Sequence, residues 1–159
     1  MLKKYLAPAL LLLFVPLSHA ANDPIRFTLG AVIKNSSRLS IAANRSRVDI
    51  VVEGAGTLTV QGKTVHFYAL CSVADTLAGT QQVDGSGDCE LKSTGTGVGY
   101  LHFRSDADHG DRGTMTLQGG TGDFADVKGS VAVEVSVNPS KVGKPVFFVE
   151  DRSAASAQP

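Results

Sequence analysis

The chain has no tryptophan, only three tyrosines and seven phenylalanines, and no surplus of basic residues. Aromatic platforms on which sugars or nucleic-acid bases stack are therefore scarce. Its 15 Lys and Arg residues balance 15 Asp and Glu residues, so the formal net charge at pH 7 is zero. A nucleic-acid binder needs a basic face that displaces counterions, whereas Arg38, Arg45 and Arg47 are scattered among serines and asparagines. The sequence predicts that nucleic acid is not a partner.

The first twenty residues have the features of a secretory signal peptide. Lys3 and Lys4 form a basic start, residues 6–17 an apolar run, and residues 18–20 (Ser-His-Ala) a small-residue cleavage site. The apolar run is too short to cross a bilayer core of about 30 Å, and no cysteine at the cleavage site offers a lipid anchor. We therefore expect cleavage before Ala21, no stable membrane anchor, and a periplasmic or secreted protein. Cleavage removes two lysines and no acid, which leaves a net charge of about −2.

Cysteine is also rare, with only Cys71 and Cys89 in the chain. An even number of cysteines in an exported domain favours a disulfide. Two thiols alone do not make a zinc site, and their spacing is not that of a redox C-x-x-C motif. We predict one structural disulfide, Cys71–Cys89, which stabilises the fold by about 3 kcal/mol on the chain-entropy model.

No segment has the periodicity of an amphipathic helix, whereas apolar and polar residues alternate along most of the chain. Such alternation, rich in β-branched side chains, is typical of half-buried strands. Clusters of Gly, Asn, Asp and Ser supply turn dihedrals between them, among them residues 53–56, 61–63 and 84–87. The predicted strands span residues 25–33, 47–52, 56–61, 64–73, 88–93, 98–104, 113–118, 125–137 and 145–150.

Many short strands at close spacing indicate a sandwich or a barrel. We predict an all-β fold with one domain, residues 21–150: a single antiparallel β-barrel of about eight strands with one disulfide. A flexible C-terminal tail is expected at 151–159. Gly95, Gly97 and Gly99 recur at every second position, which indicates either a bend that helps the barrel to close or a glycine-rich loop.

Apolar side chains share one face of most predicted strands, which identifies the core side of the sheet. A barrel of this size holds one small ligand or none. The residues that we predict to contact such a ligand are Phe27, Phe67, Leu101, Phe103, Met115 and Leu117.

Residues 117–125 contain a formal G-x-G-x-x-A match, the pattern of a dinucleotide-binding turn. That function needs a strand followed by a helix, and residues 126–137 instead alternate like a strand. We therefore assign the glycines to a connection between two strands, where they serve backbone geometry. The structural glycines of this turn are Gly119, Gly120, Gly122 and Gly129.

The run Gly119-Gly120-Thr121-Gly122, followed by Phe124 and Gly129, resembles the GGTG turn of the dirigent and allene oxide cyclase barrel proteins. Taken with the two cysteines, the resemblance covers about residues 64–137 and is to exported bacterial members of the group. It implies an eight-stranded calycin-like barrel whose apolar cavity holds a reactive small molecule in one conformation and steers its cyclisation or coupling. No catalytic residue is carried over, because the family's active-site positions have no recognisable match here.

Titratable side chains alternate with core residues on three predicted strands and would meet if those strands were neighbours. An imidazole near neutrality is able to act as an acid or a base. The other interpretation is that polar residues opposite an apolar face form the solvent side of the barrel wall. The residues concerned are His66, Tyr68, Tyr100, His102 and Glu134.

Acidic residues alternate between Asp106 and Asp111, but Gly110 occupies a ligand position of the EF-hand pattern and no glutamate closes the loop. We predict an acidic hairpin tip, with no metal site and no cofactor. Two functions remain open. One is a barrel that binds an apolar or amphipathic small molecule, with or without catalysis. The other is a non-catalytic protein with a packed barrel that acts through a partner or as a homo-oligomer.

Overall fold

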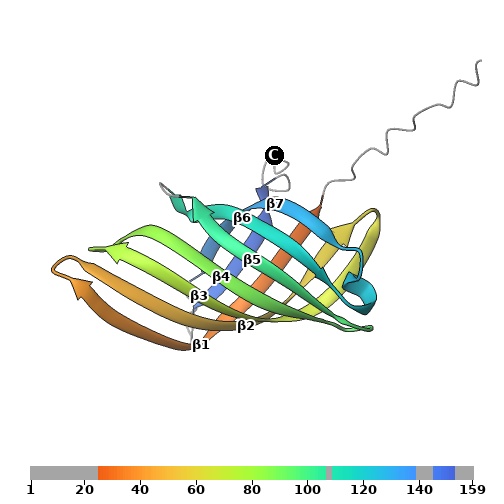
Figure 1. Ribbon diagram of the computed structural model, residues 1–159, viewed down its shortest axis with the longest axis horizontal. Coiled ribbons are helices and arrows are strands. Elements are labelled where there is room, and N and C mark those ends of the chain that lie inside the picture. Colours follow the sequence, from red (N-terminus) through yellow and green to blue (C-terminus); the bar gives the residue numbers. More distant parts are fainter. Residues whose placement is uncertain (1–24, 107–108, 139–144, 153–159) are drawn as a thin grey trace, which may run out of the picture.

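The computed structural model describes residues 25–106, 109–138 and 145–152. Eight antiparallel strands follow one another in chain order and close into one barrel (Figure 1), which confirms the predicted fold class. The predicted signal peptide and residues 153–159 of the predicted tail lie outside the described residues. The strands are β1 (Arg26–Ala42), β2 (Arg45–Val60), β3 (Lys63–Ala78), β4 (Gln81–Ser93), β5 (Val98–Asp106), β6 (His109–Gly120), β7 (Lys128–Asn138) and β8 (Val146–Asp151), and a 3-10 helix, η1 (Gly122–Phe124), lies between β6 and β7.

The barrel closes where β1 pairs with β8, with Thr28 opposite Glu150 and Val32 opposite Val146. The side chain of Asp151 stabilises this junction between β1 and β8. Its side chain is only 2% exposed and accepts hydrogen bonds from the backbone N–H of Phe27 at 3.1 Å and from Arg26 at 3.3 Å. The last strand therefore reaches one residue past the predicted end of the domain.

Two of the predicted turns are wrong. Residues 53–56 lie inside β2, which joins two predicted strands into one, and residues 84–87 lie inside β4. Inward-facing glycines explain the error: a Cβ on Gly54 would collide with the backbone of β1. Glycine in a strand marks such a close approach as well as a turn. The predicted turn at residues 61–63 does connect β2 to β3, and the β3–β4 turn contains Gly79. The φ angles of Gly62 and Gly79 are 73° and 65°.

Large side chains fill one half of the barrel interior. The rings of Phe27 and Phe67 stack with their centroids 5.6 Å apart. Phe124, on η1, is 2% exposed and lies against Gly99, where a Cβ would come within 2.6 Å of its ring. The helix therefore inserts one ring into this end of the barrel and closes it. Other fully or almost fully buried side chains of this packed half are Leu58, Leu91, Leu101 and Leu117.

The glycine-rich turn before β7 has a backbone that glycine adopts easily, with φ angles of 89° at Gly119, 54° at Gly122 and 139° at Gly129. Gly120 faces the backbone of β5, where a Cβ would collide with the Val98 carbonyl oxygen. Thr121 Oγ1 accepts a hydrogen bond from the Val98 N–H at 3.1 Å. Because residues 122–124 form η1 and residues 125–126 a turn, β7 begins at residue 128 and not at residue 125 as predicted.

Asp123 joins η1 to the loop between β4 and β5, the loop that contains Gly95 and Gly97. Its carboxylate accepts hydrogen bonds from Ser93 Oγ at 2.6 Å, from the Thr96 N–H at 2.9 Å and from Lys63 Nζ at 3.0 Å. These donors, Ser93 first, hold the pKa of Asp123 well below its usual range. The Asp123 carboxylate thus links η1 to the β4–β5 loop and to the start of β3 at the closed end of the barrel.

Candidate functional site

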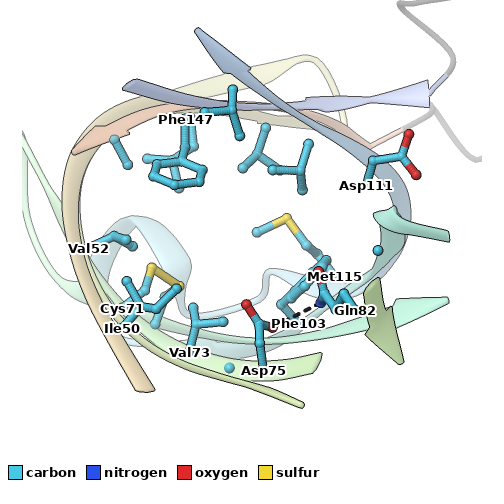
Figure 2. A pocket seen from close by; sticks show the side chains of 18 residues that line it. Ile50, Val52, Cys71, Val73, Asp75, Gln82, Phe103, Asp111, Met115 and Phe147 are labelled. Atoms are coloured by element: carbon cyan, nitrogen blue, oxygen red, sulfur yellow. Dashed lines mark hydrogen bonds between the residues drawn. A yellow bond between two sulfur atoms is a disulfide. The ribbon is translucent and has the colours of Figure 1, made fainter. Parts of the chain in front are cut away.

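The second half of the barrel interior holds a cavity of about 320 Å³ (Figure 2). All eight strands contribute to its wall. The cavity lies toward the end of the barrel where β1 meets β2, β3 meets β4 and β5 meets β6, opposite to η1. Figure 2 shows apolar side chains directed inward around it, among them Ile50, Val52, Val73, Phe103, Met115 and Phe147.

The predicted disulfide between Cys71 and Cys89 is confirmed, and it forms part of the cavity wall. The two cysteines are directly opposite each other on β3 and β4, with their Cα atoms 4.0 Å apart. The bond therefore cross-links two neighbouring strands at mid-barrel. Disulfides of this structural kind persist in oxidising compartments.

Of the six residues predicted to contact a ligand, Phe103 and Met115 line the cavity. The other four, Phe27, Phe67, Leu101 and Leu117, also face inward but lie in the packed half. Alternation predicts the direction of a side chain, whereas its depth along the barrel depends on which end η1 closes. The sequence pattern therefore identified the inner face without locating the cavity on it.

The polar part of the cavity wall was missed by the sequence analysis. Asp75 directs its carboxylate into the cavity and its Oδ1 accepts a hydrogen bond from Gln82 Nε2 at 2.9 Å (Figure 2). Burial, and then the charge of Asp84, raise the pKa of Asp75 above its ordinary value. Asp75 is the next inward-facing residue of β3 after Val73, the residue at which the predicted strand ended.

A third polar side chain lies beside this pair. Ser105 is 7% exposed, and its Oγ has no hydrogen-bond partner among the described residues. The atoms Asp75 Oδ1, Gln82 Nε2 and Ser105 Oγ all surround the point where a Cβ on Gly85 would lie, with Ser105 Oγ 3.1 Å from that point. Because Gly85 has no side chain, the Asp75 carboxylate and the Gln82 amide pack over its Cα, and Ser105, which does not itself line the cavity, lies beside them.

The five predicted polar candidates do not line the cavity. His66, Tyr68 and Tyr100 are exposed on the outer surface of the wall. His102 Nδ1 lies 2.9 Å from Asp88 Oδ1, whose side chain is 79% exposed. These positions match the interpretation that polar alternation marks the solvent side.

Glu134, the fifth candidate, is also separated from the others. It lies on β7 opposite Arg112 of β6 and Glu150 of β8. The two histidines are on β3 and β5, with β4 between them. The structure therefore brings no acid–base group together from these residues.

The acidic run 106–111 belongs to the hairpin between β5 and β6, and residues 107–108 lie outside the described chain. Asp106 accepts a hydrogen bond from Arg152 at 3.4 Å, whereas Asp111 lies exposed at the rim of the cavity. Within the described ranges, no three His, Cys, Asp or Glu side chains are grouped as metal ligands. No helix in the same ranges is long and apolar enough to cross a membrane.

Comparison with protein-family models, with curated proteins and with solved structures gives no match. The class of protein is therefore defined by the architecture itself. It is a small up-and-down antiparallel β-barrel that is plugged at one end and contains an apolar cavity in the other half.

Proposed function

We propose that this protein binds one apolar or amphipathic small molecule inside its barrel. The observation that carries the proposal is the cavity of about 320 Å³ with a mainly apolar wall. Small-molecule sites are typically concave, mostly apolar and about 300–1,000 Å³ in volume. A ligand that replaces water against this wall gains the free energy of apolar burial, about 25 cal/mol per Å².

Export to the periplasm or the cell exterior is part of the proposal. The disulfide between Cys71 and Cys89 supports it, because such bonds are rare in reducing compartments. The signal-like residues 1–20 support it independently. An exported binding barrel would meet its ligand outside the cytoplasm.

Kinship with the dirigent and allene oxide cyclase barrels extends the same proposal. Its support is the GGTG-like turn at residues 119–122 together with an eight-stranded barrel. In that case the bound molecule would be held in one conformation and steered through a cyclisation or coupling. Such catalysis acts through the shape of the cavity and needs few acid–base residues.

A fluorescence titration with indole, a neutral apolar probe small enough for this cavity, tests the binding proposal; the chain has no tryptophan to interfere with the signal. The expected result is saturable binding at one site per chain. Val73→Phe places a ring in the cavity and should abolish it, whereas Val51→Phe, on the outward face of β2 opposite Ser72, should not. Far-UV circular dichroism checks that both variants fold. Absence of saturable binding, or equal binding by both variants, would overturn the proposal.

The natural ligand is sought by native mass spectrometry of the protein purified from its own host. A small molecule that co-purifies with the wild-type chain and is lost from Val73→Phe supports the proposal. A molecule retained equally by both proteins would place its site elsewhere.

A second candidate function, self-association or partner binding, has its own observation. Apolar side chains on the outward faces of β8, β1 and β3 lie in adjacent cross-strand rows. They are Phe148, Val32, Tyr68 and Leu70, which are between 36% and 63% exposed. Exposed apolar patches of this kind often mark interaction sites. Sedimentation velocity of wild type and Leu70→Glu tests it: a concentration-dependent dimer or trimer lost in the variant supports this function, and a wild-type monomer at all concentrations contradicts self-association.

A further inference from the structure

Apart from Asp111 at the rim, the polar side chains of the described cavity wall are Asp75 and Gln82, which form one corner with unused hydrogen-bonding capacity. Asp75 Oδ1 accepts one hydrogen bond, from Gln82. A carboxylate offers about four acceptor sites, so most of its capacity is not used by that bond.

Among the described residues, the charged side chains that line the cavity are of one sign. Asp75 and Asp111 line it, Asp84 lies close enough to act on Asp75, and the described part of the wall contains no Lys, Arg or His. The strand register also places one basic residue near Asp75: Arg38 of β1 is paired with Val48 of β2, which is paired with Asp75 of β3. Arg38 therefore lies two strands away, and its Nε donates to Ser46 Oγ at 3.0 Å. A positive group in the corner would be attracted by nearby carboxylates, whereas a second carboxylate would be repelled.

We infer that the ligand of this cavity is an organic amine: an apolar body that ends in a protonated amino group placed against the Asp75 carboxylate. This inference rests on the proposed function, since it names the chemical class that the proposed site takes. An ammonium group carries three N–H donors and no acceptor. It would donate to the unused acceptor sites of the Asp75 carboxylate, and its apolar body would lie against Val52, Val73 and Met115.

The volume of the cavity sets the size of the probes. At roughly 30 Å³ per water-sized group, about 320 Å³ holds about ten non-hydrogen atoms. Octylammonium, octan-1-ol and octanoate fit this limit and differ only in the head group. The three probes therefore separate the contribution of the apolar body from that of the charge.

Isothermal titration calorimetry at pH 7 with the mature protein measures the three affinities. We expect octylammonium to bind about tenfold more tightly than octan-1-ol, the effect of one charge-assisted hydrogen bond, and octanoate to bind most weakly. Asp75→Asn should reduce octylammonium binding to the level of the alcohol and leave the alcohol unchanged. Because burial disfavours the charged form of Asp75, this variant should fold. Asp88→Asn, the same change on the outer surface, is the matched control and should have no effect.

The failures are distinguishable. If octan-1-ol binds and octylammonium binds no more tightly, the amine is wrong and the binding proposal stands. If octylammonium is preferred but Asp75→Asn leaves the preference intact, the polar corner is not the recognition site and the inference is overturned. If none of the three probes binds, both the inference and the proposed function fail.

Discussion

Replacing Phe124 by alanine should destabilise the whole barrel while leaving its cavity able to bind. The ring is 2% exposed and fills the space over Gly99 at the plugged end. Removal of a buried phenylalanine side chain costs about 3–5 kcal/mol, because apolar burial is lost and a void remains. Domains of this size are stable by only about 5–15 kcal/mol, so the change removes a large part of the total.

Guanidinium denaturation followed by far-UV circular dichroism measures the effect, since the chain has no tryptophan to report unfolding by fluorescence. A loss of 3–5 kcal/mol corresponds to a fall in Tm of roughly 10–20 °C for a domain of this length. Tyr68→Ala is the matched control: its aromatic side chain is 63% exposed on the outer wall, and its loss should change stability by less than about 0.5 kcal/mol.

Phe124 does not line the cavity, so Phe124→Ala should bind indole like wild type at temperatures where it is folded. A loss of less than about 1 kcal/mol would show that η1 does not close the barrel. Loss of probe binding in a variant that remains folded would show that the glycine-rich turn belongs to the ligand site.

Three further substitutions test how the disulfide and two carboxylates affect the stability of the fold. Replacing Cys71 and Cys89 together by serine should lower the free energy of unfolding by about 3 kcal/mol, as measured by denaturation of the variant and of the wild type with its disulfide intact. Asp123→Asn should destabilise the folded protein at neutral pH, because the pKa of Asp123 is lowered in the folded state. The stabilisation that ionised Asp123 contributes is complete above its unfolded pKa, about 4, and is lost as the pH falls toward the lower folded pKa. Asp75→Asn should have the opposite sign: the pKa of Asp75 is raised, so its charge opposes folding at neutral pH, and the gain from the substitution should disappear below about pH 4. Stability curves for wild type and the two Asp variants between pH 2 and 8 check both signs, and an Asp123→Asn deficit that persists unchanged at the acid limit would contradict the first.

The local pattern of the sequence was sufficient to predict the fold class, because period-two alternation records which side of each strand is buried. The inward faces of β3 and β6 follow directly from the spacing of their apolar residues. The glycines inside β2 and β4 were predicted to lie in turns. The sequence alone does not show whether a glycine is needed for a turn or for the close approach of a neighbouring strand. Gly54 is in a strand for the second reason.

The candidate site was predicted less well, because it depends on where each residue lies along the barrel. Phe27 and Phe103 have the same pattern in sequence, yet one is stacked in the packed half and the other lines the cavity. Asp75, Gln82 and Ser105 come from three strands and meet only because Gly85 leaves space between them. Their spacing along the sequence does not predict that these residues lie close together.

The most direct test of the central claim is a methyl NMR titration of the labelled protein with octan-1-ol. Binding in the cavity should shift the methyl signals of Ile50, Val52, Val73 and Met115, and should give intermolecular NOEs to the octyl chain. The methyl signals of Leu91, in the packed half, should move little, and those of Leu70, on the outer face, should not move. Shifts confined to Leu70, or no saturable shift in any methyl group, would contradict the account.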